Sequence, residues 1–207
     1  MSSASTSAAA SDSDEALLAR YREAEEEAFA TLYQRHKNAL YRFVHGLCSS
    51  TAQADEVFQE TWLAVVRSHA VPGRFKTWLF QIARNRLVDC WRQQKSAAMH
   101  NETTLSPTAD EKDSPQPETP ETLLLRAEQL QHISQAMETL PLQQREVFLL
   151  RAHANMELAE IAALTETPLE TVKSRYRYAL AKLRQFLLSL EPVQKTERVG
   201  MEVNTLL

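Results

Sequence analysis

The sequence predicts an all-α protein with two small helical domains joined by a flexible acidic linker. Only three of the 207 residues are glycine, and the helix-favouring residues Ala, Leu, Glu, Gln and Arg dominate the composition. Apolar residues recur near the 3.6-residue helical period in two long stretches, residues 15–97 and 121–190. Between them, residues 98–120 contain four prolines, several acids and almost no large apolar residues. That composition is typical of a linker.

Two tails and two helix breaks define the outer parts of the chain and its N-terminal half. Residues 1–14 are rich in Ser and Ala and are expected to be a disordered tail, and residues 191–207 show no clear period. A Ser-Ser-Thr sequence breaks the first helical run, and Ser50 with Gln53 predicts a capping box for the next helix. Pro72-Gly73 predicts a turn after that helix. Its apolar stripe is predicted to consist of Ala54, Val57, Phe58, Trp62, Val65 and Val66.

A third strong helix is expected from about Thr77 to Lys95. On a helical wheel, one arc of this segment is mainly polar: Thr77, Gln81, Arg84, Asn85, Val88, Arg92 and Lys95. The other side is mainly apolar: Phe75, Trp78, Leu79, Ile82, Ala83 and Cys90. We interpret Trp78 as a core residue and not as a platform on which a base stacks.

The C-terminal stretch has the pattern of a helix-turn-helix between Met156 and Leu188. A short helix is followed by a turn at residues 165–167 and then by a longer helix. Thr167 as N-cap, Pro168 at the first helical position and Glu170 as the partner in a capping box predict where the longer helix begins. Its apolar stripe is expected to comprise Leu169, Val172, Tyr176, Ala179, Leu180, Leu183 and Leu187.

Charge is segregated along the chain. The net charge of −4 alone argues against a nucleic-acid binder. However, residues 74–98 carry a net charge of +5 and residues 168–186 carry +4, whereas residues 12–28 and 101–122 each carry −5. The basic charge therefore lies in two separate helical stretches, and this distribution is more informative than the total.

The basic charge of the second stretch falls where a helix-turn-helix meets DNA. The second helix of this motif enters the major groove, and its early residues reach base edges. Lys173, Ser174, Arg177 and Tyr178 lie on the flanks of the apolar stripe or opposite to it, and Lys or Arg can bind guanine or phosphate. The alternative is an amphipathic helical hairpin whose basic face is merely solvated.

Other classes of function find little support in the sequence. No Gly-rich phosphate loop, nucleophile elbow or paired metal-ligand motif is present, so we expect neither an enzyme nor a cofactor. His45 and Cys48 have a spacing that two metal ligands could use, but a full site needs about four ligands, and a thiol in a helix core is the preferred interpretation. No apolar run is long enough to span a membrane and the N-terminus is unlike a secretory signal, so no membrane insertion and a cytoplasmic location are expected.

The C-terminal motif resembles the domain that reads the promoter −35 element in extracytoplasmic-function (ECF) sigma factors. The resemblance covers about residues 130–188 and is carried by LPLQQREVFLL and ELAEIAALTETPLETVKSRYRYALAKLR. This family often has Gly where Thr165 stands, and Ser or Thr where Glu157 opens the first helix. Response-regulator output domains carry a similar helix-turn-helix. The resemblance implies −35 contacts by Thr171, Lys173, Ser174, Arg175, Arg177 and Tyr178.

Two segments of the N-terminal half resemble the same family. ADEVFQETWLAVV, residues 54–66, is similar to its polymerase-binding helix, which implies contacts by Asp55, Glu56, Gln59 and Glu60. FKTWLFQIARNRLVDCWRQQK, residues 75–95, resembles the segment that reads and melts the −10 element. It implies DNA contacts by Arg74, Lys76, Arg84, Asn85, Arg92 and Lys95. Asn85 and the loop at residues 68–75 match the positions that hold an unstacked base.

The resemblance implies a domain division and a set of partners. Residues 15–97 would bind core RNA polymerase and melt the −10 element, and residues 121–190 would read the −35 element. The implied partners are core RNA polymerase, promoter DNA and an anti-sigma factor. Two alternatives remain open: a sigma-mimicking adaptor that sequesters an anti-sigma factor, and a helix-turn-helix transcriptional regulator.

Overall fold

The computed structural model describes residues 12–70, 72–98, 132 and 134–190, and every regular element in this part of the chain is a helix. The fold class predicted from the sequence is therefore confirmed. The bounds of the helices are α2 Asp14–Arg22, α3 Glu26–His45, α4 Thr51–Arg67, α5 Phe75–Ala98, α7 Leu142–Ala152, α8 Leu158–Leu164 and α9 Leu169–Leu190. Residues 99–120 of the predicted linker, the tail at 191–207 and residues 1–11 lie outside the described residues.

Local capping explains where the first helices begin. Ser13 Oγ accepts a hydrogen bond from Ala16 N at 3.2 Å, so α2 begins within the last residues of the expected tail. The tail prediction is therefore wrong for residues 12–14. At α4, Ser50 Oγ accepts from Gln53 N at 3.3 Å, which confirms Ser50 as the N-cap. The reciprocal bond of the predicted capping box differs, because Gln53 Oε1 accepts from Ser49 N at 3.2 Å. Each N-cap bond satisfies a backbone N–H that the helix itself leaves without a partner.

The helix α5 begins two residues earlier than its sequence pattern predicts. The carboxylate of Glu15, on α2, accepts a hydrogen bond from Phe75 N at 2.8 Å. This contact satisfies an amide at the start of α5 with a side chain 60 residues earlier in the chain. A cap supplied from so far away leaves no local signal in the sequence.

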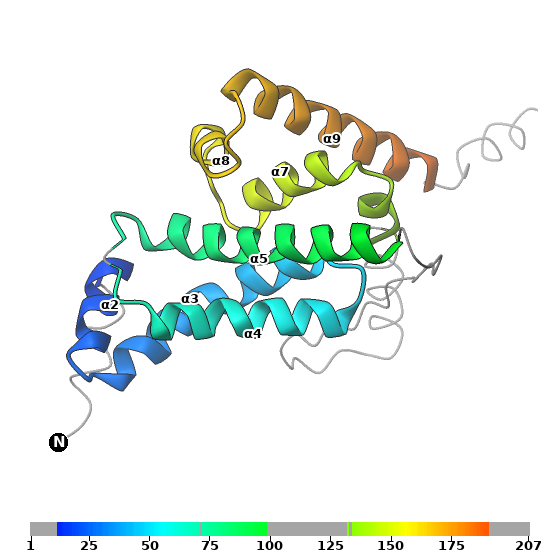
Figure 1. Ribbon diagram of the computed structural model, residues 1–207. Helices are drawn as coiled ribbons and strands as arrows, with labels where there is room; N and C mark the ends of the chain where they lie inside the picture. Colours follow the sequence, from blue (N-terminus) through cyan, green and yellow to red (C-terminus); the bar gives the residue numbers. More distant parts are fainter. Residues whose placement is uncertain (1–11, 71, 99–131, 133, 191–207) are drawn as a thin grey trace, which may run out of the picture.

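One continuous cluster of buried side chains joins the N-terminal helices α2–α5 to the C-terminal helices α7–α9. In Figure 1, α5 lies between α3 and α4 on one side and α7 and α9 on the other. Its inner face buries Phe75, Leu79, Phe80 and Leu87 completely, and the ring centroids of Phe80 and Phe43 lie 5.3 Å apart. The α5 helix therefore forms the middle layer of the molecule.

Two apolar predictions for the N-terminal helices have different outcomes. Trp78 packs against the core, with its ring centroid 6.0 Å from that of Phe75, as expected for a core residue. Val66, which the pattern places in the apolar stripe of α4, is instead exposed. It lies directly after the buried Val65, and only one of two adjacent helical residues can face the core at this point. Within the described residues, no helix is both long and apolar enough to cross a bilayer.

Candidate nucleic-acid interface

The helices α8 and α9 form the predicted helix-turn-helix, but the turn differs in detail from the prediction. Thr165 keeps a right-handed backbone and donates its hydroxyl proton to Ile161 O at 2.7 Å, whereas Glu166 adopts the left-handed region with φ of 52°. The residue whose conformation favours glycine is thus Glu166 and not Thr165.

The second helix of the motif begins at Leu169, and its predicted capping box does not form. The Thr167 hydroxyl donates to Thr165 O at 3.1 Å, and the Glu170 carboxylate accepts from Lys173 Nζ at 2.7 Å. Pro168 O instead accepts from Thr171 N and Val172 N, at 2.9 and 3.1 Å. The start of α9 is therefore within a residue of the predicted position, although its side-chain partners differ.

One face of α9 packs inward and the opposite face is open to solvent. Val172 and Ala179 are completely buried, which confirms the centre of the predicted stripe. Lys173, Arg177 and Tyr178 are exposed, and the Arg177 Cζ atom lies 5.3 Å from the centroid of the Tyr178 ring. A cation resting on an aromatic ring limits the conformations that both exposed side chains sample. This exposed set is the part of α9 that DNA could reach.

Two apolar residues of the predicted α9 stripe lie at the surface. Leu169 and Leu180 are both exposed, so the expectation that they are buried is wrong. Leu169 stands at the first position of α9, and Leu180 is adjacent to the buried Ala179. Leu180 also lines a surface cavity together with Phe148, Tyr176 and Leu183. The buried stripe is therefore narrower than the apolar pattern suggests.

Arg175 and Ser174, two of the six candidate −35 residues, form hydrogen bonds with α7, the turn and the α9 backbone. Arg175 donates to Gln143 Oε1 at 2.8 Å and to Thr167 Oγ1 at 3.4 Å, so it ties α9 to α7 and to the turn. Ser174 Oγ donates to Thr171 O at 2.8 Å. These contacts hold the helix-turn-helix together, and they leave Lys173, Arg177 and Tyr178 as the candidates that project outward.

A second candidate surface lies on α4 and combines acidic with apolar side chains. Asp55, Glu56 and Gln59 are exposed, and Glu60 Oε2 lies 3.6 Å from Nε of Arg86 on α5. Leu63 and Val66 are exposed on the same helix, and they follow Gln59 by four and seven residues, a spacing that shares one helix face. We call Asp55, Glu56, Gln59, Glu60, Leu63 and Val66 the α4 surface. The sequence pattern did not single out Leu63.

Arg84, one of the candidate −10 residues on α5, already contacts the C-terminal helices. Arg84 Nε donates to Glu146 Oε1 of α7 at 2.8 Å, and the Glu146 side chain is only 6% exposed. Burial raises the pKa of Glu146, while the charge and hydrogen bond of Arg84 oppose that rise. The pKa of Glu146 is raised overall, and the neighbouring Arg84 limits that rise.

Two further cations before and at the start of α5 also contact the C-terminal helices. Arg74 forms an ion pair with Glu160 of α8, and Lys76 Nζ donates to Asn155 O at 3.2 Å. The pKa of Glu160 is lowered first by its bond from the Glu157 backbone and further by Lys76 and Arg74. We call this packing of α5 against α7 and α8 the closed arrangement.

Asn85 and Arg92 form polar contacts within α5. Asn85 is exposed and its Oδ1 accepts from Gln81 Nε2 at 3.1 Å. Arg92 lies 3.6 Å from Asp89 of the same helix. Lys95 is part of α5, but its side chain lies outside the described part of the chain. Arg74, Lys76 and Arg84 are therefore the candidates for which contacts with the C-terminal half are seen.

The closed arrangement also brings α3 close to α7. A Cβ atom added at Gly46, just after α3, would lie 2.7 Å from Leu149 Cδ1. Among the described residues, no group of three metal-binding side chains gathers, and Cys48 is buried, which raises the pKa of its thiol to about 12.

Two family models and several known proteins match this chain. Residues 32–97 match the family model for Sigma-70 region 2, and residues 136–185 match that for Sigma-70 region 4. The chain is 31% identical over 173 residues to the ECF RNA polymerase sigma factor SigL of Mycobacterium tuberculosis, covering 81% of this chain and 93% of SigL. It is 29% identical over 184 residues to the ECF RNA polymerase sigma factor SigX of Bacillus subtilis, covering 87% and 94%. The solved structure of CnrH in complex with the cytosolic domain of CnrY has a TM-score of 0.56 at 25% identity, covering 86% of this chain and 99% of that chain.

Proposed function

Because the chain belongs to the ECF RNA polymerase sigma factors, which direct core RNA polymerase to promoters, we propose that α9 reads the −35 element and α5 opens the −10 element. The observation that carries this proposal is the exposed face of α9. Lys173, Arg177 and Tyr178 stand opposite the buried Val172 and Ala179. A recognition helix needs this division between a packed side and a polar side that faces the major groove.

For the −10 element, we propose that α5 and the loop before it act on the separated strands. Basic side chains would hold the displaced strand, and Asn85 with the loop at residues 68–74 would hold an unstacked base. Arg74, Lys76 and Arg84 contact Glu160, Asn155 and Glu146, so the C-terminal helices cover this part of α5 and would exclude DNA from it. The closed arrangement therefore has to open before the −10 element binds.

For core polymerase, we propose that the α4 surface is the docking site. Its acidic residues suit a basic partner helix, and the exposed Leu63 and Val66 supply apolar area at the centre of the contact. Core polymerase acts in the cytoplasm, which is therefore the proposed location of the protein. An anti-sigma factor is the proposed regulatory partner, and the solved complex of CnrH with a cytosolic protein domain supports this.

Transcription in a defined system tests the function as a whole. Purified chain and core RNA polymerase are combined with a pool of genomic fragments, and run-off transcripts are sequenced. We expect a small set of start sites that share one −35 and one −10 sequence. Core polymerase alone is the control. Transcripts that do not depend on the added chain would contradict the proposed function and favour a sigma-mimicking adaptor.

Replacing three residues of the α4 surface should weaken capture by core polymerase. We expect Asp55→Ala, Gln59→Ala and Glu60→Ala together to lower the affinity by roughly tenfold, because a complementary charged edge is lost. Capture on immobilised core measures the effect, and circular dichroism checks the helix content. The matched control is Glu26→Ala with Glu27→Ala, which removes the same charge from the exposed first turn of α3. Equal capture of the triple variant and wild type would reject this docking surface.

A further inference from the structure

The helix α2 lies outside the part of the chain that matches the Sigma-70 region 2 family model. That match begins at residue 32, whereas α2 spans Asp14–Arg22. Its two ends contact the two ends of the loop that joins α4 to α5, residues 68–74. The loop is the one proposed above to hold an unstacked −10 base.

The C-terminal end of α2 holds the start of the loop. The Arg22 guanidinium donates to Ser68 O at 3.5 Å and also to Ala70 O. Two carbonyls two residues apart thereby share one planar, charged donor group. Because hydrogen bonds from a charged donor are stronger than neutral ones, these contacts restrict the backbone directly after α4.

The N-terminal turn of α2 holds the end of the loop. The Glu15 carboxylate accepts from Phe75 N at 2.8 Å. The Phe75 ring is completely buried, and its centroid lies 5.4 Å from that of His36, whose Nε2 is 2.7 Å from Asp14 Oδ2. Two adjacent acids of α2 therefore act on Phe75. Glu15 binds its backbone amide, and Asp14 binds His36, whose ring lies beside the Phe75 ring.

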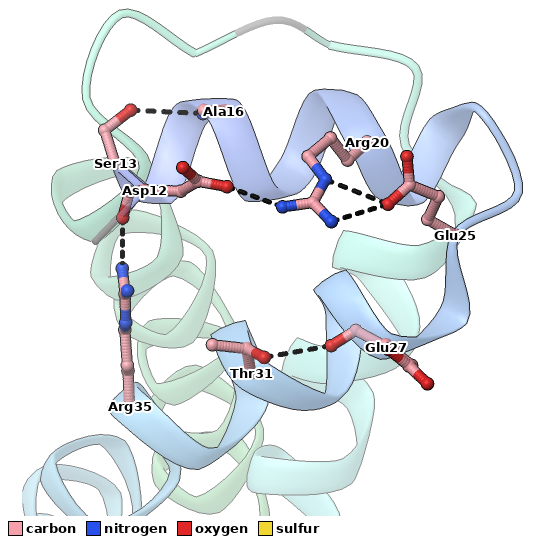
Figure 2. A network of polar contacts seen from close by, with 8 residues as sticks. All are labelled: Asp12, Ser13, Ala16, Arg20, Glu25, Glu27, Thr31 and Arg35. Carbon is pink, nitrogen blue, oxygen red and sulfur yellow. Dashed lines mark hydrogen bonds and ion pairs between the residues drawn. The ribbon is translucent and has the colours of Figure 1, made fainter. Parts of the chain in front are cut away.

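The helix α2 is itself fixed to the rest of the fold. Leu17 and Leu18 are buried in the core. Arg20 pairs with Glu25 at 2.7 Å and with Asp12 at 2.5 Å, and Arg35 of α3 donates to Asp12 O at 2.7 Å (Figure 2). Because these contacts fix α2 to the core and to α3, α2 can in turn restrict the backbone of the loop that it contacts.

We infer that α2 is a positioning element for promoter opening, in which Arg22 and Glu15 fix the two ends of the 68–74 loop. This role rests on the proposed function of the loop and of α5. A loop that is already ordered pays less conformational entropy when it captures a base that leaves the stack. Arg22 and Glu15 touch no base in this account and act only through the loop and Phe75.

The test compares opening and base preference for holoenzymes that carry single substitutions. Duplex promoter opening is followed by permanganate reactivity on a promoter recovered by the run-off experiment. Base preference is the ratio of affinities for two pre-opened templates that differ at one −10 base of the non-template strand. We expect Arg22→Ala and Glu15→Ala to lower opening about tenfold, the effect of losing a charged hydrogen bond, and to move the ratio toward one.

Conservative and control variants separate positioning from a general loss of stability. Glu15→Gln keeps an oxygen that accepts from Phe75 N and should restore both readouts. Glu23→Ala changes an exposed residue just after α2 and should behave as wild type. Hydrogen exchange on the full-length chain should show faster exchange at Phe75 N and the loop amides in Glu15→Ala, with α3 unchanged. A merely destabilised protein would instead lose affinity for both templates equally.

The outcomes distinguish this inference from the function on which it rests. Wild-type opening and an unchanged base ratio in Arg22→Ala and Glu15→Ala, beside an active wild-type holoenzyme, would overturn the role of α2 and leave the proposed function standing. A wild-type chain that supports no transcription would overturn the proposed function and this role together.

Discussion

Reversing the charge of Arg84 should open the closed arrangement, and exchanging the charges of the pair should close it again. Arg84 Nε now lies 2.8 Å from Oε1 of the buried Glu146, so Arg84→Glu would place a second carboxylate beside it. Breaking a buried pair in this way costs about 3–5 kcal/mol, because an uncompensated charge is left behind. This cost destabilises only the closed arrangement, because Glu146 is hydrated again when α7 separates from α5. Small-angle scattering of the variant should show a larger radius of gyration.

Two further variants make this result specific. Arg84→Glu combined with Glu146→Arg restores an attractive pair and should return the radius of gyration toward the wild-type value. Arg86→Glu is the matched control, because Arg86 lies two residues along α5, is exposed, and pairs with Glu60 and not with α7. A radius of gyration that stays at the wild-type value in Arg84→Glu would mean that the pair does not hold the closed arrangement.

Removing the outward cations of α9 should abolish transcription that depends on the −35 element. A good bidentate contact to a base contributes about 1–3 kcal/mol. Lys173→Ala with Arg177→Ala should therefore weaken binding to the −35 duplex by roughly a hundredfold if both side chains contact bases. The stability of the domain should change little, because both side chains are exposed. Transcription from matched promoters with and without the −35 element measures the loss.

A charge-matched variant and a single substitution refine this prediction. Lys37→Ala with Arg184→Ala removes two positive charges away from the first turns of α9 and should keep −35 dependence. Arg177→Ala alone should relax the preference at one −35 position if Arg177 reads a base, and should weaken all sequences equally if it contacts phosphate. Normal −35-dependent transcription by the Lys173→Ala, Arg177→Ala variant would reject DNA reading by α9 and favour the sigma-mimicking adaptor.

Local signals were enough to predict the helices and the outward residues of α9. The Ser50 cap and the helical period act over a few residues, so their outcome can be seen in the sequence. The same holds for Lys173 and Arg177. They are exposed because Val172 and Ala179, on the other side of α9, face the core. Apolar residues next to this stripe, such as Leu180 and Val66, were assigned too generously, since hydrophobicity alone does not decide which of two neighbours is buried.

Long-range contacts account for what the sequence did not predict. The first residue of α5 depends on Glu15, and the occupation of Arg84 depends on Glu146, which follows it by 62 residues. Glu146 stands among other polar residues in LPLQQREVFLL, and no local pattern distinguishes a buried acid there from a solvated one. Arg175 likewise reads as a DNA contact until its bond to Gln143 is seen.

The ion pairs of the closed arrangement have a consequence for how binding responds to ionic strength. Cations that meet DNA normally release condensed counterions, so added salt weakens binding in proportion to the phosphates contacted. Arg84 and Arg74 already face Glu146 and Glu160, and added salt weakens the exposed part of those pairs as well. Salt would thus favour the opening of the protein while it disfavours the contact with DNA. For this chain, the dependence of promoter affinity on salt should be shallower than its number of phosphate contacts implies.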